Sequence, residues 1–350
     1  MKIGWSATLL VTAGAMALAG TAGGRSAADG GLPPKVTAIP RSISVLTYNV
    51  KGLPWPVARG RSEALEQISA TFRSLRARGD APDIAVVQEA FTADARAMIR
   101  HSGYRYIALG PQTQMSQGRP AGVADRVFAT AAHWSAGETE GSFVGSGLAI
   151  LSDHPIIKVR KMTFPAFDCA GYDCLAAKGA LIVTVTTPEA PEGIDVLTTR
   201  LNSRGASGVS NVRSDHAWQR QLAHLATFIA DAHDPDLPLI VAGDFNVGHS
   251  PERRLAFLAS VSRWTRAVRP RDALREIAAA GGVLDADARW SMRRARDWQL
   301  HYDGSSIGLQ TIRITTPFGR DRSGDMLSDH VGYVATYRLR ALTTPARPTA

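Results

Sequence analysis

The hydrophobic positions along this chain follow two periods, one typical of strands and the other of helices. Ser42–Val50 alternates apolar and polar residues and is rich in β-branched side chains, which predicts a strand. Glu63–Arg78 repeats apolar residues every three or four positions and is followed by Gly79, which predicts a helix that ends there. The same helical spacing predicts a long helix over Ser214–Ala232.

Further segments of both kinds alternate along the chain. Strands are predicted at Asp83–Val87, Tyr104–Leu109, Gly147–Ser152, Ala180–Thr186, Ile194–Leu201, Leu239–Gly243, Trp298–Tyr302, Leu309–Thr315 and Val331–Leu339, and helices near Pro251–Ser262 and Arg271–Ala280. Residues 111–145 are rich in Gly, Gln and Ser and are expected to form a long surface excursion. Neighbouring strand pairs, and strands at both ends, favour a mixed-sheet α/β (α+β) sandwich over a doubly wound parallel sheet.

The first residues differ from the rest of the chain. Lys2 precedes the apolar run Ile3–Ala19, and small residues follow through Ala28, which is typical of a signal peptide. A membrane anchor is the alternative, but the Ser, Thr and Gly residues in this run make a weak spanning helix. We expect a signal peptide at 1–28, a linker at 29–41, one folded domain at 42–340 and a tail at 341–350. The protein is then secreted or periplasmic.

Composition and charge narrow the class of partner. The 350 residues are 45% hydrophobic and 20% charged, which is enough apolar material for one sizeable core. The formal net charge of +9 becomes +7 if Lys2 and Arg25 leave with the signal peptide. A basic exported protein suits anionic partners such as nucleic acid or acidic lipid surfaces, and charge alone does not choose between them. No obligate protein partner is inferred.

The two cysteines, Cys169 and Cys174, lie five positions apart. In an oxidising compartment such a pair closes a small loop, so the signal peptide favours a disulfide over two free thiols. A zinc site needs more ligands than this stretch supplies.

Polar clusters stand at the ends of several predicted strands. They are Tyr48-Asn49-Val50, Gln88-Glu89, Gly243-Asp244-Phe245-Asn246 and Ser328-Asp329-His330. Buried carboxylates and amides need a partner, and Mg²⁺ prefers oxygen ligands of this kind. Asp244 and Asn246 point to one side of an extended chain, whereas Asp329 and His330 diverge, so one can face a metal and the other a substrate. Each cluster alone is more often a turn or a helix cap, so only their combination indicates a site.

In combination they resemble the DNase-I-like endonuclease/exonuclease/phosphatase superfamily over residues 42–340. The matching motifs are Thr47-Tyr48-Asn49-Val50, Val87-Gln88-Glu89, Gly147-Leu148-Ala149-Ile150-Leu151-Ser152, Gly243-Asp244-Phe245-Asn246 and Ser328-Asp329-His330. The resemblance implies a four-layer sandwich of two mixed β-sheets flanked by helices. It also implies a metal-dependent phosphodiester hydrolase that needs no covalent protein intermediate.

The resemblance further implies roles for individual residues. Mg²⁺, or Mn²⁺ or Ca²⁺, is expected to be held chiefly by Glu89, with Asn49 and Asp329 nearby.

Asp244 and Asn246 are expected to orient water and phosphate, and His330 to complete the hydrolytic site. Asp297 falls near the position of an aspartate that orients this histidine, although a solvated aspartate is an equal alternative there. His330 is suited to acid or base catalysis near neutral pH.

The chain departs from the family pattern at one position. Arg200 stands where a strand-end Thr-His-Leu motif of the family carries a histidine that stabilises phosphate. Arginine offers a permanent charge and a bidentate phosphate contact, but it cannot act as an acid or base. The alternative is that Arg200 marks an inactive member.

The substrate is suggested by the segment Asp173–Gly179. It resembles the Leu-Ala-x-Lys-Gly loop of neutral and bacterial sphingomyelinases, which implies that Asp173 and Lys178 lie beside the active site, with Lys178 near the phosphate. The alternative is a surface loop that leads into the strand Ala180–Thr186. A phospholipid substrate at a membrane surface is therefore expected, with a secreted nuclease as the alternative and a non-catalytic binding protein as a third hypothesis. Trp290 and Trp298, among several arginines, form either a basic aromatic surface or part of the core.

Overall fold

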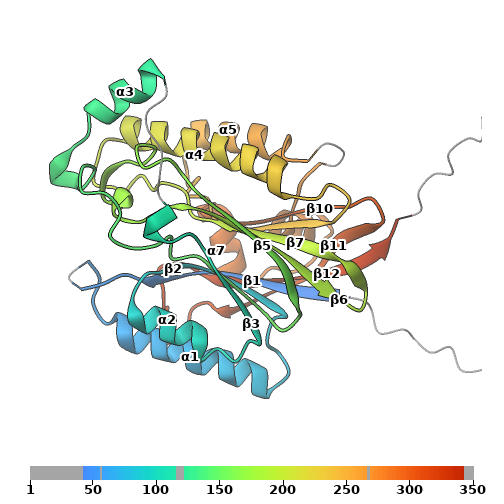
Figure 1. The fold of residues 1–350 in the computed structure, drawn as a ribbon. Coiled ribbons are helices and arrows are strands. Elements are labelled where there is room, and N and C mark those ends of the chain that lie inside the picture. Colours follow the sequence, from blue (N-terminus) through green and yellow to red (C-terminus); the bar gives the residue numbers. More distant parts are fainter. Residues whose placement is uncertain (1–41, 56, 116–121, 266–268, 343–350) are drawn as a thin grey trace, which may run out of the picture. The chain divides into compact units, whose positions relative to one another are not determined.

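Two six-stranded β-sheets pack face to face in the computed structural model. It describes residues 42–342 apart from 56, 116–121 and 266–268, so the predicted signal peptide (1–28), the linker (29–41) and nearly all of the tail (341–350) lie outside the described residues. No helix within the described ranges is long and apolar enough to cross a membrane. The two sheets and the helices that cover them form the predicted four layers (Figure 1).

The first sheet has the strand order β11-β12-β1-β2-β4-β3. Its strands are β1 (Ser42–Gly52), β2 (Ile84–Ala90), β3 (Tyr106–Leu109), β4 (Ala149–Ser152), β11 (Ile307–Phe318) and β12 (Gly332–Ala341). At the centre, β1 runs parallel to β2 and antiparallel to β12. Every residue of β2 is buried, as expected for an apolar strand that is covered on both faces.

The second sheet has the order β5-β6-β7-β8-β10-β9. Its strands are β5 (Ile156–Thr163), β6 (Gly179–Thr187), β7 (Ala190–Thr199), β8 (Leu239–Asp244), β9 (Arg271–Asp272) and β10 (Asp297–Tyr302). Here β7 and β8 are the parallel pair, and β10 runs antiparallel to β8. Each sheet therefore brings the carboxyl ends of two neighbouring strands to one edge.

Three hydrophobic layers hold the sheets and helices together. Val45, Val86 and Ile150 of the first sheet meet Val183, Val196 and Ile240 of the second in the layer between the sheets. The helices α1 (Arg61–Ala77) and α2 (Ala93–Arg100) cover the outer face of the first sheet, and α4 (Asn211–Ala232) and α5 (Pro251–Val261) cover that of the second (Figure 1). The predicted long helix is α4, and its apolar face, which includes Trp218 and Leu225, is buried.

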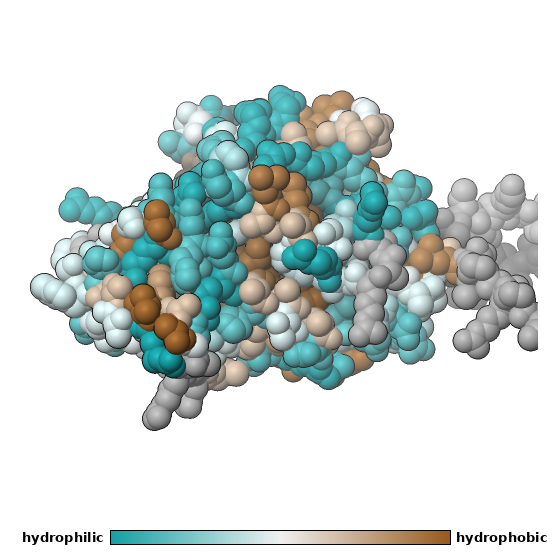
Figure 2. Space-filling model, turned by 90° about the horizontal axis from the view of Figure 1, so that it is seen from above, coloured by the Kyte–Doolittle hydropathy of each residue, from teal (hydrophilic) through white to brown (hydrophobic). Residues whose placement is uncertain are grey.

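The outer helical faces meet solvent. Figure 2 looks onto the side covered by α3 (Val123–Thr130), α4 and α5, where hydrophilic side chains predominate around a central, more hydrophobic stretch. Single exposed apolar residues such as Val212 and Leu255 are ordinary on such a surface.

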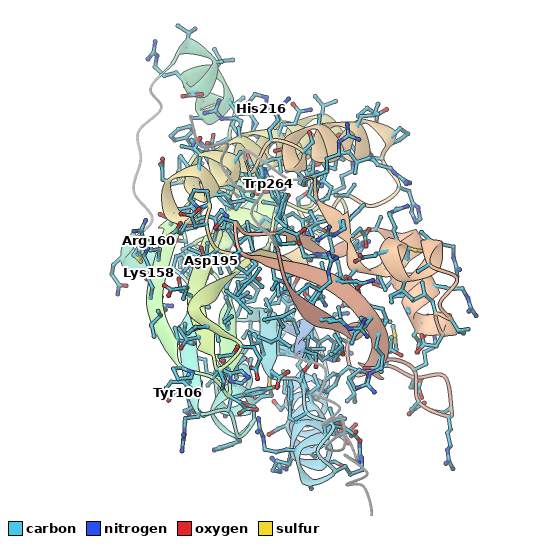
Figure 3. The ribbon with its side chains drawn as sticks, turned by 90° about the vertical axis from the view of Figure 1, so that its right-hand side faces the viewer. Tyr106, Lys158, Arg160, Asp195, His216 and Trp264 are labelled. Atoms are coloured by element: carbon cyan, nitrogen blue, oxygen red, sulfur yellow. A yellow bond between two sulfur atoms is a disulfide. The ribbon has the colours of Figure 1, made fainter. Side chains whose placement is uncertain are left out.

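Some elements were not predicted from the sequence. Residues 111–145 contain α3 and two short 3-10 turns rather than only loop, and α2 and α7 (Ala286–Arg294) were missed because each spans only two turns or so. Strand β5 was missed because most of its residues are exposed, which removes the alternating pattern. Lys158 and Arg160 project from β5 at the edge of the sheet (Figure 3), where charge discourages pairing with another chain.

The helix predicted over Arg271–Ala280 begins later than expected. Arg271 and Asp272 form the short strand β9, and the side chain of Asp272 accepts hydrogen bonds from the backbone N–H groups of Leu274 and Arg275. This N-cap starts α6 (Ala273–Ala279).

Candidate active site

Asn49 and Glu89 lie at the carboxyl ends of the parallel strands β1 and β2. The Nδ2 group of Asn49 donates hydrogen bonds to Glu89 Oε1 at 2.9 Å and to Asp244 Oδ2 at 3.1 Å. Asp244 ends β8 in the other sheet, so this amide joins the two sheets at their shared edge. All three side chains are buried.

Asp244 and Asn246 remain close together, as their spacing predicts. The backbone N–H of Asn246 donates to Asp244 Oδ1 at 3.1 Å, and its side-chain amide donates to the carbonyl of Leu201 at 2.9 Å. The preceding Gly243 permits this close packing, because a Cβ there would lie 2.5 Å from the carbonyl oxygen of Thr199.

His330 and Asp297 form a buried pair beside Asp244. Asp297 begins β10 and stands opposite Asp244 in the antiparallel register. The Nδ1 atom of His330 lies 2.9 and 2.8 Å from the two carboxylate oxygens of Asp297. Burial acts to lower the pKa of His330, but the charge and hydrogen bonding of Asp297 outweigh it and raise the pKa to about 9. The imidazole is therefore protonated at neutral pH.

Ser328 fixes the loop that carries His330. Its hydroxyl donates to the backbone carbonyl of Asn49 at 2.7 Å and accepts from the backbone N–H of His330 at 3.3 Å. The adjacent Asp329 also lines the cleft but is half exposed, and its carboxylate lies 3.5 Å from the amino group of Lys51. Asp329 and His330 thus diverge, as expected for adjacent residues.

Arg200 is buried among three carboxylates. Its Nε atom lies 2.7 Å from Glu89 Oε1, its Nη1 donates to Asp173 Oδ1 at 3.0 Å, and Asp244 Oδ2 is 3.9 Å away. Burial acts to lower the pKa of Arg200, but these carboxylates raise it, so the guanidinium stays charged. The Nε–H group lacks an aligned hydrogen-bond acceptor, so charge rather than hydrogen-bond geometry holds it against Glu89.

Lys178, which we expected beside the active site, contacts the cleft residue Asp173 but does not itself line the cleft. Its Nζ atom is 3.0 Å from Asp173 Oδ1 and donates to the carbonyl of Leu201 at 3.0 Å. Burial lowers the pKa of Lys178 to about 8. Asp173 does line the cleft. Burial acts to raise the pKa of Asp173, but the positive charges of Lys178 and Arg200 outweigh burial and lower this pKa to about 2. In this structure Lys178 therefore supports Asp173 rather than lining the cleft.

The predicted disulfide joins Cys169 to Cys174 with a sulfur–sulfur distance of 2.06 Å. It closes the segment that contains Gly171 and Asp173. A Cβ at Gly171 would lie 1.7 Å from the carbonyl oxygen of Ser207, and the residue has a φ of 65°, so only glycine fits this turn. The disulfide and the glycine together fix the position of Asp173, and through it that of Arg200.

A cleft of about 1070 Å³ opens over these residues. Its lining combines the charged cluster with apolar side chains from separate loops. These apolar residues are Leu53, Pro54, Val57, Phe143, Val144, Tyr172 and Leu175. We name Val57, Phe143 and Tyr172, together with Trp55 from the same loop as Val57, the apolar rim, because each is more than half exposed. Sequence patterns missed the rim because loops carry no hydrophobic period.

Backbone strain gathers at the same place. Four non-glycine residues among those described have positive φ angles, and three of them, Lys51, Glu89 and Asn246, line the cleft. Strained conformations of this kind cost about 1–3 kcal/mol each and concentrate at functional sites. This strain is a signal that the sequence did not contain.

The donor chemistry of the cluster fits a hard divalent cation. Four buried carboxylates, those of Glu89, Asp173, Asp244 and Asp297, face Arg200, Lys178 and the protonated His330. The cluster keeps net negative charge, and carboxylate oxygens are the ligand type that Mg²⁺ prefers. Ligand atoms of Asp244, Asp297 and His330 also lie within 4.8 Å of one another, although the ion pair already occupies His330.

The two tryptophans near the basic segment have different environments. Trp298 is buried and packs against the ring of Phe257, so it belongs to the core. Trp290 is half buried between the guanidinium groups of Arg294 and Arg320. The basic aromatic surface considered from the sequence is therefore limited to Trp290.

Comparison with known proteins places this arrangement in a family. Sphingomyelinase C from Streptomyces griseocarneus has a similar structure, with 20% identity, a TM-score of 0.53 and coverage of 84% of this chain and 99% of that one. A beta toxin variant from Staphylococcus aureus with bound magnesium ions gives 14% identity and a TM-score of 0.55 over 84% and 99%. TDP2 from D. rerio, complexed with a single-strand DNA product, gives 14% and 0.53 over 85% and 98%.

These likenesses show a shared fold. No curated protein matches the chain at significant similarity. Residues 46–330 match the Endonuclease/Exonuclease/phosphatase family, and this match includes every strand-end cluster from Asn49 to His330. The chain therefore belongs to the endonuclease/exonuclease/phosphatase family.

Proposed function

We propose that the protein is a metal-dependent phosphodiester hydrolase of the sphingomyelinase or phospholipase C type. The observation that carries the choice of a lipid is the apolar part of the cleft lining, which shares one cleft with the charged cluster and includes three exposed residues of the apolar rim. A phospholipid presents a phosphodiester next to acyl chains, and the charged and apolar parts of the lining suit these two parts. The apolar rim also suits contact with a lipid surface.

Glu89, with Asn49 and Asp329, would hold Mg²⁺, Mn²⁺ or Ca²⁺. When bound, such an ion neutralises a phosphoryl oxygen and stabilises the leaving oxygen. For Asn49 to act as a ligand, its amide must turn, because it now presents its nitrogen to Glu89 and Asp244.

The remaining residues of the cluster have separate roles in this proposal. Asp244 accepts a proton from the attacking water, and Asn246 orients the water and the phosphate. The protonated imidazole of His330, held by Asp297, donates to a phosphoryl oxygen as negative charge increases there. Arg200 supplies a second positive charge to the phosphoryl oxygens.

A secreted nuclease is the second candidate. The formal net charge of +9 is compatible with it, because phosphate contacts of a nucleic acid exploit positive charge, but the same charge also suits an acidic lipid surface. A direct comparison separates the two: purified protein is incubated with sphingomyelin vesicles or with plasmid DNA, in Mg²⁺ and in EDTA. Release of phosphocholine without nicking of the plasmid supports the lipid proposal. Rapid nicking without lipid hydrolysis contradicts it, and no turnover of either substrate favours a non-catalytic binding protein.

We propose that the protein is exported. The support is the signal-like composition of residues 1–28 and the Cys169–Cys174 disulfide, which persists in oxidising compartments. Fractionation of expressing cells, followed by N-terminal sequencing of the product, tests this. Full-length protein retained in the cytoplasm would contradict export.

A further inference from the structure

Arg200 is in contact with the side chain that is expected to hold the metal. Its guanidinium lies against Glu89 Oε1 at 2.7 Å and near Asp244 Oδ2 at 3.9 Å. A divalent ion taken up by Glu89 must share this carboxylate with a permanent cation. Two positive charges at this distance repel each other strongly in a buried site, where solvent screens little.

The two halves of the guanidinium are held differently. Toward Asp173, Nη1 donates an aligned hydrogen bond of 3.0 Å, and Asp173 is itself fixed by the backbone N–H of Ser203 at 2.6 Å and by Lys178. Toward Glu89, the buried Nε–H has no aligned acceptor. The contact with Asp173 is therefore an anchor, and the contact with Glu89 is the one that can be released at lower cost.

Released from Glu89, the Nε–H group needs another acceptor. Arg200 lines the cleft together with Glu89, Asp244 and His330, so an anionic oxygen of a ligand bound in the cleft would lie near this donor. A phosphate oxygen is the suitable acceptor, because guanidinium groups bind phosphate by paired, charge-assisted hydrogen bonds.

We propose that Arg200 is a built-in competitor of the divalent metal at Glu89, and that metal binding transfers its guanidinium from Glu89 to the phosphate of the ligand. Metal and phosphate then bind with positive cooperativity. The phosphate accepts the guanidinium that would otherwise repel the metal, and the metal releases the guanidinium from Glu89 for the phosphate. The inference rests on the proposed metal site, and it concerns a residue at which this chain departs from the family pattern.

Direct metal binding tests the proposal without recourse to turnover. Protein freed of metal with EDTA and dialysed is titrated with Mn²⁺, and the free ion is followed by electron paramagnetic resonance, with and without phosphocholine. Arg200→Ala and Arg200→Gln should bind Mn²⁺ about tenfold more tightly than the unmodified protein. Phosphocholine should tighten Mn²⁺ binding about fivefold or more in the unmodified protein and have little effect in either variant.

Lys178→Met is the matched control, since it removes a buried positive charge from the same network without a contact to Glu89. It should change Mn²⁺ affinity by less than about twofold if contact with Glu89 is the cause. Thermal melting in EDTA establishes that each variant is folded, and Arg200→Gln, which keeps a donor for Asp173, replaces Arg200→Ala if the latter is not.

The outcomes separate this inference from the proposed function. Unchanged Mn²⁺ affinity in both Arg200 variants overturns the competition while leaving the metal site intact. An equal gain in Lys178→Met would assign the effect to charge alone and also overturn it. The absence of any Mn²⁺ binding, in the unmodified protein and in every variant, overturns the metal site and the competition together.

Discussion

His330 and Asp297 are joined by a two-oxygen contact, with Nδ1 of the imidazole 2.9 and 2.8 Å from the carboxylate oxygens. Asp297 is in turn opposite Asp244 in the sheet, so the pair is positioned by strand register rather than by a loop. Because Asp297 keeps the imidazole charged, His330 can meet an oxygen in the cleft only as a donor. In the proposed mechanism this favours stabilisation of phosphoryl charge over removal of a proton from water.

We therefore expect His330→Ala to reduce turnover of a phosphodiester by about a hundredfold or more. Asp297→Asn should also reduce turnover, because the imidazole loses the charge that keeps it protonated. His249→Ala is the control, since this histidine lines the same cleft but is exposed. Initial rates on a soluble chromogenic phosphodiester provide the measurement. Near-normal turnover in His330→Ala would remove the residue on which the proposed chemistry most depends.

Removal of the metal should abolish activity. EDTA is expected to stop hydrolysis of the phosphodiester, and added Mg²⁺ to restore it. Glu89→Gln should require far more Mg²⁺ for half-maximal activity while unfolding at a similar temperature, because the amide is a weaker ligand that keeps the side-chain shape. Full activity in EDTA would contradict the metal-assisted mechanism.

Much of this fold could be predicted from the sequence because its strands and main helices bury one regular face. The helix expected at Ser214–Ala232 is α4, and the strand expected at Leu239–Gly243 is β8. Strand β5 could not be predicted because most of its residues are exposed, so it has no alternating apolar pattern. The helix α2 is too short to show a helical repeat of apolar residues.

The site was partly predictable for a related reason. Asn49, Glu89 and Asp244 lie at the ends of apolar strands, which made them candidates from the sequence, and the packing of the two sheets brings them within hydrogen-bond distance. The ion pair of Arg200 with Glu89 joins residues 111 positions apart and depends on how the two sheets face each other. The side chain of Lys178 points to Asp173, and residue spacing along the chain does not predict this direction.

The disulfide should matter for both stability and activity. Closing a loop this short lowers the entropy of the unfolded chain by an amount worth about 2 kcal/mol. We expect a Cys169→Ser, Cys174→Ser double variant to lose about this much in urea unfolding, and to lose turnover because Asp173 no longer fixes Arg200. Dithiothreitol should inhibit the unmodified protein and leave the double variant unchanged. Equal inhibition of both proteins would show that the reductant acts elsewhere.

Acid stability should depend on Glu276, which does not line the cleft and helps to join α6 to β10 and β11. Burial acts to raise the pKa of Glu276, but hydrogen bonds with His301 and Thr311 lower it from 4.5 to about 2. A depressed folded-state pKa stabilises the protein above the unfolded value and loses that effect as pH falls. The contribution should therefore be complete above about pH 4.5 and disappear as pH approaches 2.

Urea unfolding at several pH values measures this dependence. Glu276→Gln should be less stable than the unmodified protein at pH 6, and the difference should narrow between pH 4.5 and 2. Glu66→Gln, at an exposed position on α1, provides the control and should follow the unmodified protein throughout. A constant difference at every pH would mean that ionisation of Glu276 is not responsible.

The apolar rim should be needed for lipid surfaces and not for the chemistry. Trp55 and Phe143 are 77% and 67% exposed, so replacing them with serine removes no core packing and should leave the melting temperature unchanged. A Trp55→Ser, Phe143→Ser variant should hydrolyse a soluble phosphodiester at a normal rate but bind and hydrolyse sphingomyelin vesicles at least about tenfold less well, because two exposed aromatic groups lose their burial in the bilayer interface. Leu255→Ser, on the outer face of α5, is the control, because it removes an exposed apolar side chain away from the cleft. Vesicle sedimentation and release of phosphocholine measure the two effects. If Leu255→Ser loses as much vesicle binding as the rim variant, or if the rim variant binds normally, the cleft does not meet lipid through this surface.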